Sequence, residues 1–83
     1  MKLLYFAWVR QKIGKNEEFF SLPVGVSTIG ELALHLCGLG PGYADAFGDL
    51  TRLRAAANRQ HVGFETRVGP NDEIAFFPPV TGG

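Results

Sequence analysis

Two glycines at the C-terminus, Gly82 and Gly83, are the residues whose type and position most directly suggest chemistry. Glycine has no Cβ, so a Gly-Gly end can pass through a narrow channel and adopt backbone angles that are closed to other residues. The terminal carboxylate becomes reactive only when one of its oxygens is part of a good leaving group. An ATP-dependent partner could supply that group by making an acyl-adenylate at Gly83. The opposite interpretation is a frayed end without function, and the glycine pair alone does not decide between the two.

The residues before the glycines form a stiff spacer. Pro78 and Pro79 lack N–H donors and hold the backbone extended, and Val80 and Thr81 follow them. Residues 78–83 can span about 20 Å at roughly 3.3 Å per residue. We therefore expect these residues to be a flexible tail that is long enough to enter a buried site in another protein.

No other part of the chain has a pattern typical of catalysis. His35, Cys37 and His61 lack metal-ligand spacing, which predicts no metal site. The glycines of 38–42 superficially resemble a phosphate-binding loop, but they follow a predicted helix, whereas the dinucleotide motif opens one. Cys37 is interpreted as a small core residue and His35 as a solvated helix residue. Since there is also no nucleophile motif and no acid/base pair, we predict that the isolated chain is not an enzyme and binds no cofactor stably.

Length and charge limit the possible partners. The 83 residues predict a single domain, 1–83, and eight basic residues balance eight acidic ones. Without a net positive field, nucleic acid is not expected as a partner. The apolar run between Lys2 and Arg10 is too short to span a membrane, so no membrane partner is expected. One cysteine fits a reducing compartment, and the predicted localisation is cytoplasmic.

Apolar, aromatic and β-branched residues predict a first strand over residues 2–10. A turn over 11–16 and a returning strand over 17–22 would complete a hairpin. The charged ends of the first strand indicate which of its faces reaches water. That face carries the apolar side chains of Leu4, Phe6 and Trp8.

Thr28-Ile29-Gly30-Glu31 has the pattern of a capping box and predicts the start of a helix that runs from Ile29 to Cys37. Gly38 and Gly40 can take the left-handed conformation that ends helices. A short helical turn is expected over 43–47.

The remaining residues predict strands over 53–58, 60–64 and 73–77. This order predicts an α+β domain with one main helix packed on one face of a mixed sheet. In the last strand, Ile74 and Phe76 would face the core, and Phe77 would join the outer face if the first and last strands pair.

Two segments carry a resemblance to a known family. The block Ala56-Ala57-Asn58 and the run from Gly69 to Gly83, above all its end from Asp72 onward, closely resemble the small, sulfur-carrying subunit of molybdopterin synthase. The opening Tyr5-Phe6-Ala7-Trp8-Val9-Arg10 and the capped helix at Thr28 agree with it. This ubiquitin-like family, the MoaD/ThiS family, has a β-grasp fold, and the resemblance covers essentially the whole chain.

The resemblance implies that Gly83 is adenylated by a ubiquitin-activating-like adenylyltransferase, which consumes ATP, and is then converted to a thiocarboxylate. The sulfur donor would be a cysteine desulfurase or a rhodanese. In this family the tail, with Gly82 before the reacting Gly83, enters the large subunit of molybdopterin synthase. Sulfur is there transferred to cyclic pyranopterin monophosphate. Two carriers supply the dithiolene, as expected for a heterotetramer.

The resemblance also implies a docking surface beside the tail. Phe6 and Phe77 are the expected contacts, and Trp8 and His61 are expected on or near the same surface. His61 is a departure, because relatives are expected to carry an apolar residue at its position.

Three other functions remain open at this point. The chain could carry sulfur for another pathway, such as thiazole synthesis or tRNA thiolation. It could be a ubiquitin-like modifier whose Gly83 forms isopeptide bonds with lysines. It could also be a plain interaction domain with an inert tail.

Overall fold

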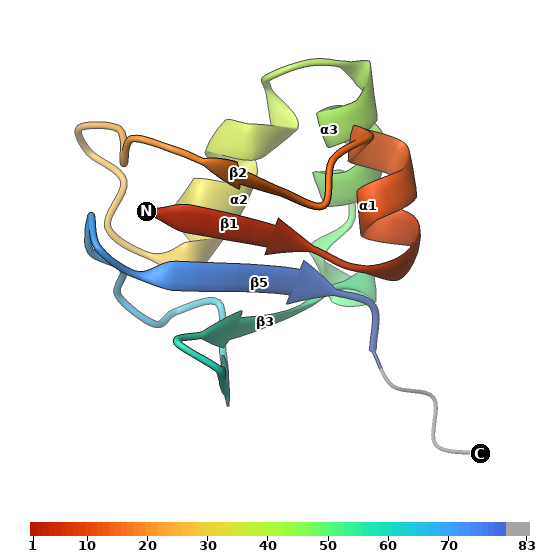
Figure 1. Ribbon diagram of the computed structural model, residues 1–83. Helices are drawn as coiled ribbons and strands as arrows, with labels where there is room; N and C mark the ends of the chain where they lie inside the picture. The colour runs from red at the N-terminus through yellow and green to blue at the C-terminus, as the bar shows by residue number, and fades with distance from the viewer. Residues whose placement is uncertain (80–83) are drawn as a thin grey trace.

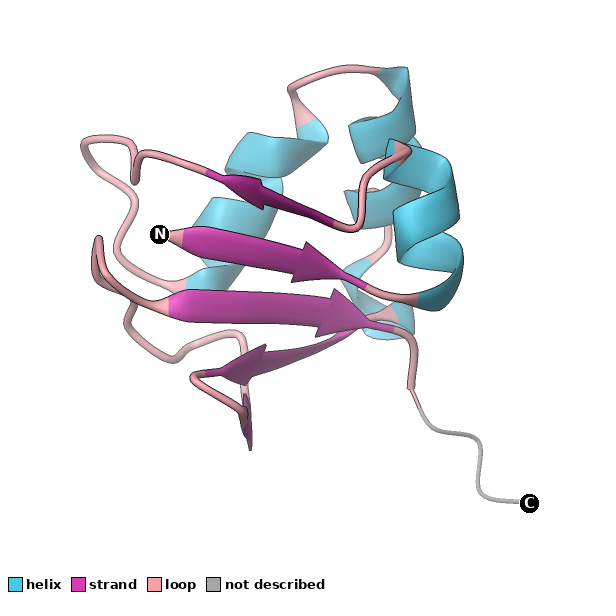
Figure 2. Ribbon diagram, viewed as in Figure 1, coloured by secondary structure: helices cyan, strands magenta, loops and turns pink. Residues whose placement is uncertain are grey.

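The computed structural model describes residues 1–79, and the tail residues Val80, Thr81, Gly82 and Gly83 lie outside the described part. In Figures 1 and 2, all the helices lie in the earlier part of the chain, together with the first strands, and the rest of the chain forms strands. The elements are, in order, β1 (Lys2–Tyr5), α1 (Ala7–Ile13), β2 (Glu17–Phe19), α2 (Ile29–Cys37), α3 (Pro41–Phe47), the 3-10 turn η1 (Leu50–Arg52), β3 (Arg54–Ala57), β4 (Gln60–Val62) and β5 (Glu73–Phe77).

All five strands form one mixed sheet in the order β2-β1-β5-β3-β4. The central pair, β1 and β5, is parallel, and the three other pairings are antiparallel. Helix α2 crosses one face of the sheet, and α1 and α3 lie near the end where β1 and β5 finish (Figure 2). An α+β fold with a mixed sheet was predicted and is confirmed. The short helical turn expected over 43–47 is the longer helix α3, and only α1 was not expected beside the main helix.

In the two central strands, buried and partly exposed residues alternate strictly, which separates the core from the outer face. Leu3 pairs with Ile74 and Tyr5 pairs with Phe76, and all four side chains are buried beneath the helices. Their burial confirms the predicted faces of both strands. The core is completed by apolar side chains from the helices, from β3 and from the residue just before it, namely Val9, Ile29, Leu32, Ala33, Leu36, Ala46, Phe47, Leu53 and Ala55.

Helix α2 begins with the predicted capping box and has the predicted bounds. The Thr28 hydroxyl accepts from the Glu31 amide at 3.2 Å, and the Glu31 carboxylate accepts from the Thr28 amide at 3.0 Å. Hydrogen bonds from Ser27 and then Thr28 lower the pKa of Glu31. The left-handed ending predicted at Gly38 is wrong, because Gly38 has φ −86° and its amide bonds back to the helix.

The predicted strand over residues 2–10 is wrong after Tyr5. Phe6 is still extended, but Ala7 has φ +54° and starts helix α1. Val9 is fully buried and Ile13, one turn later, packs against the same core, so the apolar residues here follow a helical period. The turn expected over 11–16 is therefore mostly the end of α1, which Gly14 terminates at φ +86°.

A hydrogen-bonded carboxylate ties strand β2 to the first strand and to α3. Glu18 accepts from the hydroxyls of Tyr5 at 2.8 Å and Tyr43 at 2.7 Å, and Lys15 lies 3.2 Å from its other oxygen. Burial disfavours the charged form of Glu18, but the hydrogen bonds from Tyr43, Tyr5 and Lys15 outweigh it and lower the pKa. Burial, followed by the bond to Glu18, raises the pKa of Tyr5.

The Glu18 cluster predicts a loss of stability in acid. The pKa of Glu18 is lower in the folded state, so its contribution is present above the ordinary value of about 4.3 and is lost as the pH falls through the lowered value. Glu18→Gln should reduce the free energy of unfolding at neutral pH by about 1 kcal/mol. In this variant the free energy of unfolding, measured by urea unfolding at several pH values, should also fall less steeply as the pH is lowered. If it falls as steeply as in the wild type, Glu18 is not responsible for the loss of stability in acid.

Helices α1 and α3 approach each other closely at Gly42. A Cβ at this position would overlap the backbone carbonyl oxygen of Lys12. Because a backbone atom of a packed helix cannot move aside as a flexible side chain can, only glycine fits here without displacement of one helix.

Gly42→Ala should therefore lower the free energy of unfolding by about 1–3 kcal/mol, as overpacking does elsewhere. Gly38→Ala is the matched control, since its Cβ would meet only the His35 carbonyl oxygen at an ordinary 3.6 Å. Urea unfolding of both variants measures the difference. Equal stability of the two would contradict the close approach.

Candidate functional site

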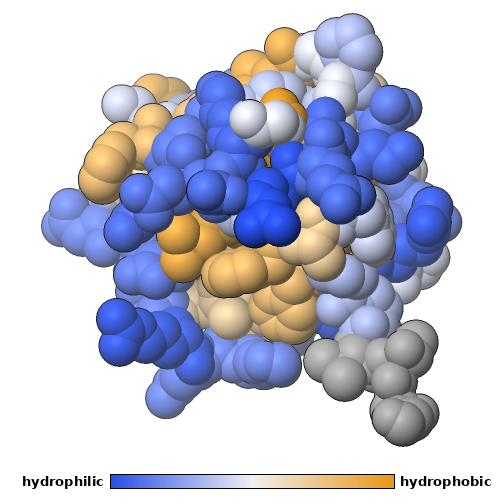
Figure 3. Space-filling model, turned by 45° about the vertical axis from the view of Figure 1, so that its right-hand side comes forward, coloured by the Kyte–Doolittle hydropathy of each residue, from blue (hydrophilic) through white to orange (hydrophobic). Residues whose placement is uncertain are grey.

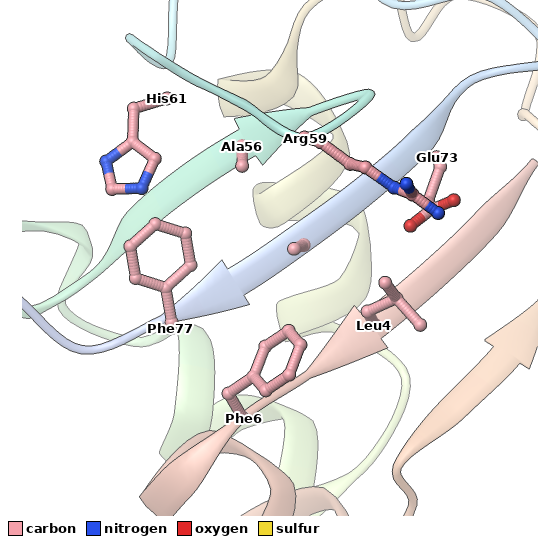
Figure 4. Close-up of a pocket in the computed structure, with 8 residues that line it drawn as sticks. Leu4, Phe6, Ala56, Arg59, His61, Glu73 and Phe77 are labelled. Atoms are coloured by element: carbon pink, nitrogen blue, oxygen red, sulfur yellow. The ribbon is translucent and has the colours of Figure 1, made fainter.

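The outer face of the sheet, opposite α2, contains a hollow of about 500 Å³. In the space-filling view of Figure 3, apolar surface gathers at the centre of the face in view and is ringed by hydrophilic side chains. Figure 4 shows the residues around the hollow, which come from β1, β3, β4, β5 and the turns beside them. The hollow is lined by Leu4, Phe6, Ala56, Arg59, His61, Glu73, Ala75 and Phe77.

Strand register brings these residues together from distant parts of the sequence. Leu4 of β1 lies beside Ala75 of β5, and Ala75 lies beside Ala56 of β3. Ala56 in turn pairs with His61 of β4. Since residues that pair directly across a ladder share a face, one row of outward side chains crosses four strands.

The end of the hollow nearest the tail is aromatic. Phe6 is 48% exposed, and the rings of His61 and Phe77 lie 5.0 Å apart between centroids. The Phe6 amide donates to the Phe76 carbonyl at 3.2 Å, which ties the residue to β5. Exposed aromatic side chains in a concave apolar surface are typical of protein–protein contacts.

The other end of the hollow is charged and depends on a two-residue hairpin turn. Asn58 and Arg59 have φ of +51° and +72°, as the tight hairpin turn with two left-handed residues requires. The Asn58 side chain accepts from the Glu73 amide at 3.0 Å and donates to Asp72 at 3.2 Å. These bonds hold Arg59 over the start of β5, next to the hollow.

The structure brings together three of the four predicted docking residues. Phe6, His61 and Phe77 line the hollow, and Pro78 and Pro79 follow Phe77 directly. Their role in docking stays a prediction. Ala56, Arg59, Glu73 and Ala75 were not predicted as site residues, although alternation along the last strand places Glu73 and Ala75 on the outer face.

Trp8 does not join this surface, which corrects the expected placement. It lies in α1, partly buried against the core, and the Arg52 guanidinium stacks 5.1 Å from its ring centroid. The alternation that placed Trp8 beside Phe6 does not apply, because the chain turns into a helix at Ala7.

Other chemical groups are few in the described part of the chain. Among residues 1–79, no three His, Cys, Asp or Glu side chains gather in a way that could hold a metal ion. Cys37 is a half-buried free thiol against the core, and exposed His35 makes an edge contact with Phe20. None of the helices in this part is long and apolar enough to cross a membrane. The concave apolar surface with its aromatic end points to binding of another molecule at the outer face.

Comparison with known proteins identifies the family. The sequence model of the ThiS family matches residues 3–83. Molybdopterin synthase sulfur carrier subunits from Escherichia coli and Haemophilus influenzae are each 36% identical over 83 residues, covering all of this chain and 99% of theirs. The one from Dictyostelium discoideum is 34% identical, covering 99% of this chain and 94% of its own. The chain belongs to the ThiS family, which confirms the predicted resemblance.

Solved structures support the fold. A crystal structure of SAMP1 from Haloferax volcanii has a TM-score of 0.75 at 26% identity and covers 100% of this chain and 98% of its own. The solution structure of the HVO 2177 protein from the same organism has a TM-score of 0.77 at 25% identity, with 99% and 84% covered. Together with the mixed sheet, these neighbours confirm the predicted ubiquitin-like β-grasp fold.

Arginine substitutions on the two opposite faces of β5 test the assignment of those faces. Phe77→Arg should leave the domain folded, because it places a charge at the wet face. Ile74→Arg should destabilise it by about 3–5 kcal/mol or more, since Ile74 is fully buried and the new charge would have no partner. Circular dichroism and urea unfolding measure both. Unfolding of Phe77→Arg with a stable Ile74→Arg would mean that the faces are reversed.

Proposed function

We propose that this chain is the sulfur carrier subunit of molybdopterin synthase and acts in molybdenum cofactor biosynthesis. The observation that carries the proposal is similarity to three proteins of that name along nearly their full lengths. The match to the family extends to residue 83 and so includes both glycines. The chain is then a carrier that is consumed and recharged, and the catalytic groups belong to its partners.

Charging takes place at the C-terminal carboxylate of Gly83. A ubiquitin-activating-like adenylyltransferase joins this carboxylate to the α-phosphate of ATP, and pyrophosphate leaves. Sulfur from a cysteine desulfurase or a rhodanese then attacks the acyl carbon. AMP departs with the former carboxylate oxygen, and because the donor holds its sulfur as a persulfide, the chain is now joined to the donor's cysteine through an acyl disulfide. A thiol reductant cleaves the sulfur–sulfur bond, so that the chain ends in a thiocarboxylate and the donor's cysteine forms a disulfide with the reductant. Gly82 and Gly83 have no side chains that would hinder either attack.

Transfer takes place in the large subunit. The thiocarboxylate sulfur forms a bond to carbon in cyclic pyranopterin monophosphate as a carbon–oxygen bond there breaks and the oxygen leaves, so that the carrier is held through a thioester. Water cleaves the bond between the acyl carbon and sulfur. The sulfur stays on the pterin and Gly83 is a carboxylate again. Two carriers in a heterotetramer supply the two sulfurs of the dithiolene.

The outer hollow positions the tail for this chemistry. A partner that covers Phe6 and Phe77 lies at the point where Pro78 leaves the sheet. Burial of aromatic side chains supplies binding energy away from the reacting atoms, which leaves the small Gly-Gly end free to enter the active site. We place the cycle in the cytoplasm, where the free thiol of Cys37 would stay reduced.

Intact-mass spectrometry tests the proposal. Incubated with ATP, the activating enzyme and a sulfur donor, the chain should gain the mass difference between sulfur and oxygen at Gly83. Cys37→Ser should charge normally, and deletion of Gly83 should abolish both charging and sulfur transfer without loss of stability. Sulfur found on Cys37 as a persulfide, or product formed by the deletion variant, would contradict the proposal.

The products formed by the charged chain separate the alternatives. A thiocarboxylate that sulfurates the pterin precursor supports the proposal, whereas a charged chain that serves only thiazole synthesis or tRNA thiolation supports another carrier role. Peptides with Gly83 joined to lysine side chains would indicate a protein modifier. A chain that is never charged would be an interaction domain with an inert tail.

A further inference from the structure

Two alanines form the centre of the outer hollow. Ala56 and Ala75 pair directly across β3 and β5, and both line the hollow among larger side chains, as Figure 4 shows for Ala56. Ala56 is only 8% exposed, yet it is outside the core cluster to which its neighbour Ala55 belongs. Its burial therefore comes from the outer face. Alanine is disfavoured in strands, and its small size at these two positions opens a space among larger neighbours.

Building on the proposed function, we infer that Ala56 and Ala75 are specificity-determining residues for the large subunit. They leave room for one bulky apolar side chain that projects from the surface of that subunit. Leu4, Phe6 and Phe77 supply apolar walls around it. A side chain seated there loses its contact with water on several sides, as binding hot spots do.

Two features favour a partner protein as the occupant. The first is continuity with the tail: Phe77 lines the hollow and Pro78 follows it, so a protein that receives the tail lies against this surface. The second is charge. Arg59 and Glu73 border the other end of the hollow, and within residues 1–79 neither takes part in an ion pair. A partner surface can place opposite charges against both of them around the inserted side chain.

A second copy of the chain fits less well. Two copies that met with their hollows directly opposed would leave both unfilled at a loss of packing contacts. A second copy could fill the hollow only by reaching across it with another exposed apolar side chain, such as that of Phe19, which is 82% exposed and lies on β2 at the edge of the same face.

Filling the hollow tests the inference. Ala75→Leu in the full chain should bind the purified large subunit at least roughly tenfold more weakly in a calorimetric titration. Glu17→Leu is the matched control, because Glu17 pairs with Leu4 on the same face but does not line the hollow. It should bind within about twofold of wild type, since only an exposed ion pair with Lys2 is lost. Circular dichroism should show both variants folded.

A graded variant and a rescue make the test more specific. Ala75→Val fills less of the hollow and should give an intermediate loss, which also decides the matter if the leucine variant does not fold. Large-subunit variants with exposed apolar residues truncated to alanine, one at a time, should include one that regains affinity for Ala75→Leu. That residue is the inserted side chain.

The outcomes separate this inference from the function on which it rests. If Ala75→Leu and Ala75→Val bind as tightly as wild type, the inference is wrong, while sulfur transfer by the wild type would still support the proposed function. If the wild type is neither charged nor bound, the proposed function fails. If the variants alter only self-association in sedimentation experiments, the occupant is a second copy and the inference is wrong.

Discussion

The parallel pairing of β1 with β5 determines both surfaces of the sheet. Its register places Leu3 beside Ile74 and Tyr5 beside Phe76, under the helices, and it places Leu4 beside Ala75 on the outer face. A slip of one residue would turn the core side chains of one strand toward water. The pairing also brings the end of β5, where the tail begins, next to the end of β1. Core and outer hollow are therefore two consequences of one register.

The core and the outer hollow lie on opposite faces of this sheet. The buried core lies on the helical side, and the Glu18 cluster fastens the short strand β2 to α3 from the edge. The outer hollow contributes no side chain to the core cluster. Its residues are therefore free to match a partner, because changes there need not disturb the packing that holds the domain together.

The alternation of residue types along the strands and the capping box of α2 are sufficient to predict much of the fold. Both faces of residues 2–5 and 73–77, the capped helix and the family follow from the sequence and are confirmed. The first strand was extended too far, because Val9 is apolar at a position that suits a strand and a helix equally. Trp8 was misplaced for the same reason. Ala56 and Ala75 meet in the outer hollow only because β3 pairs with β5, and no local sequence pattern specifies that pairing. The Asn58-Arg59 turn lacks the glycine that usually signals such a hairpin. The chemistry at Gly82 and Gly83 stays a prediction.

The two strands at the edges of the sheet, β2 and β4, are only three residues long. An edge strand offers unpaired backbone N–H and C=O groups to other chains, and a short one offers few of them. Addition of a further strand at either side would therefore gain little hydrogen bonding. A carrier that must keep an apolar surface open between partners can in this way limit the strand-to-strand association that leads to aggregates.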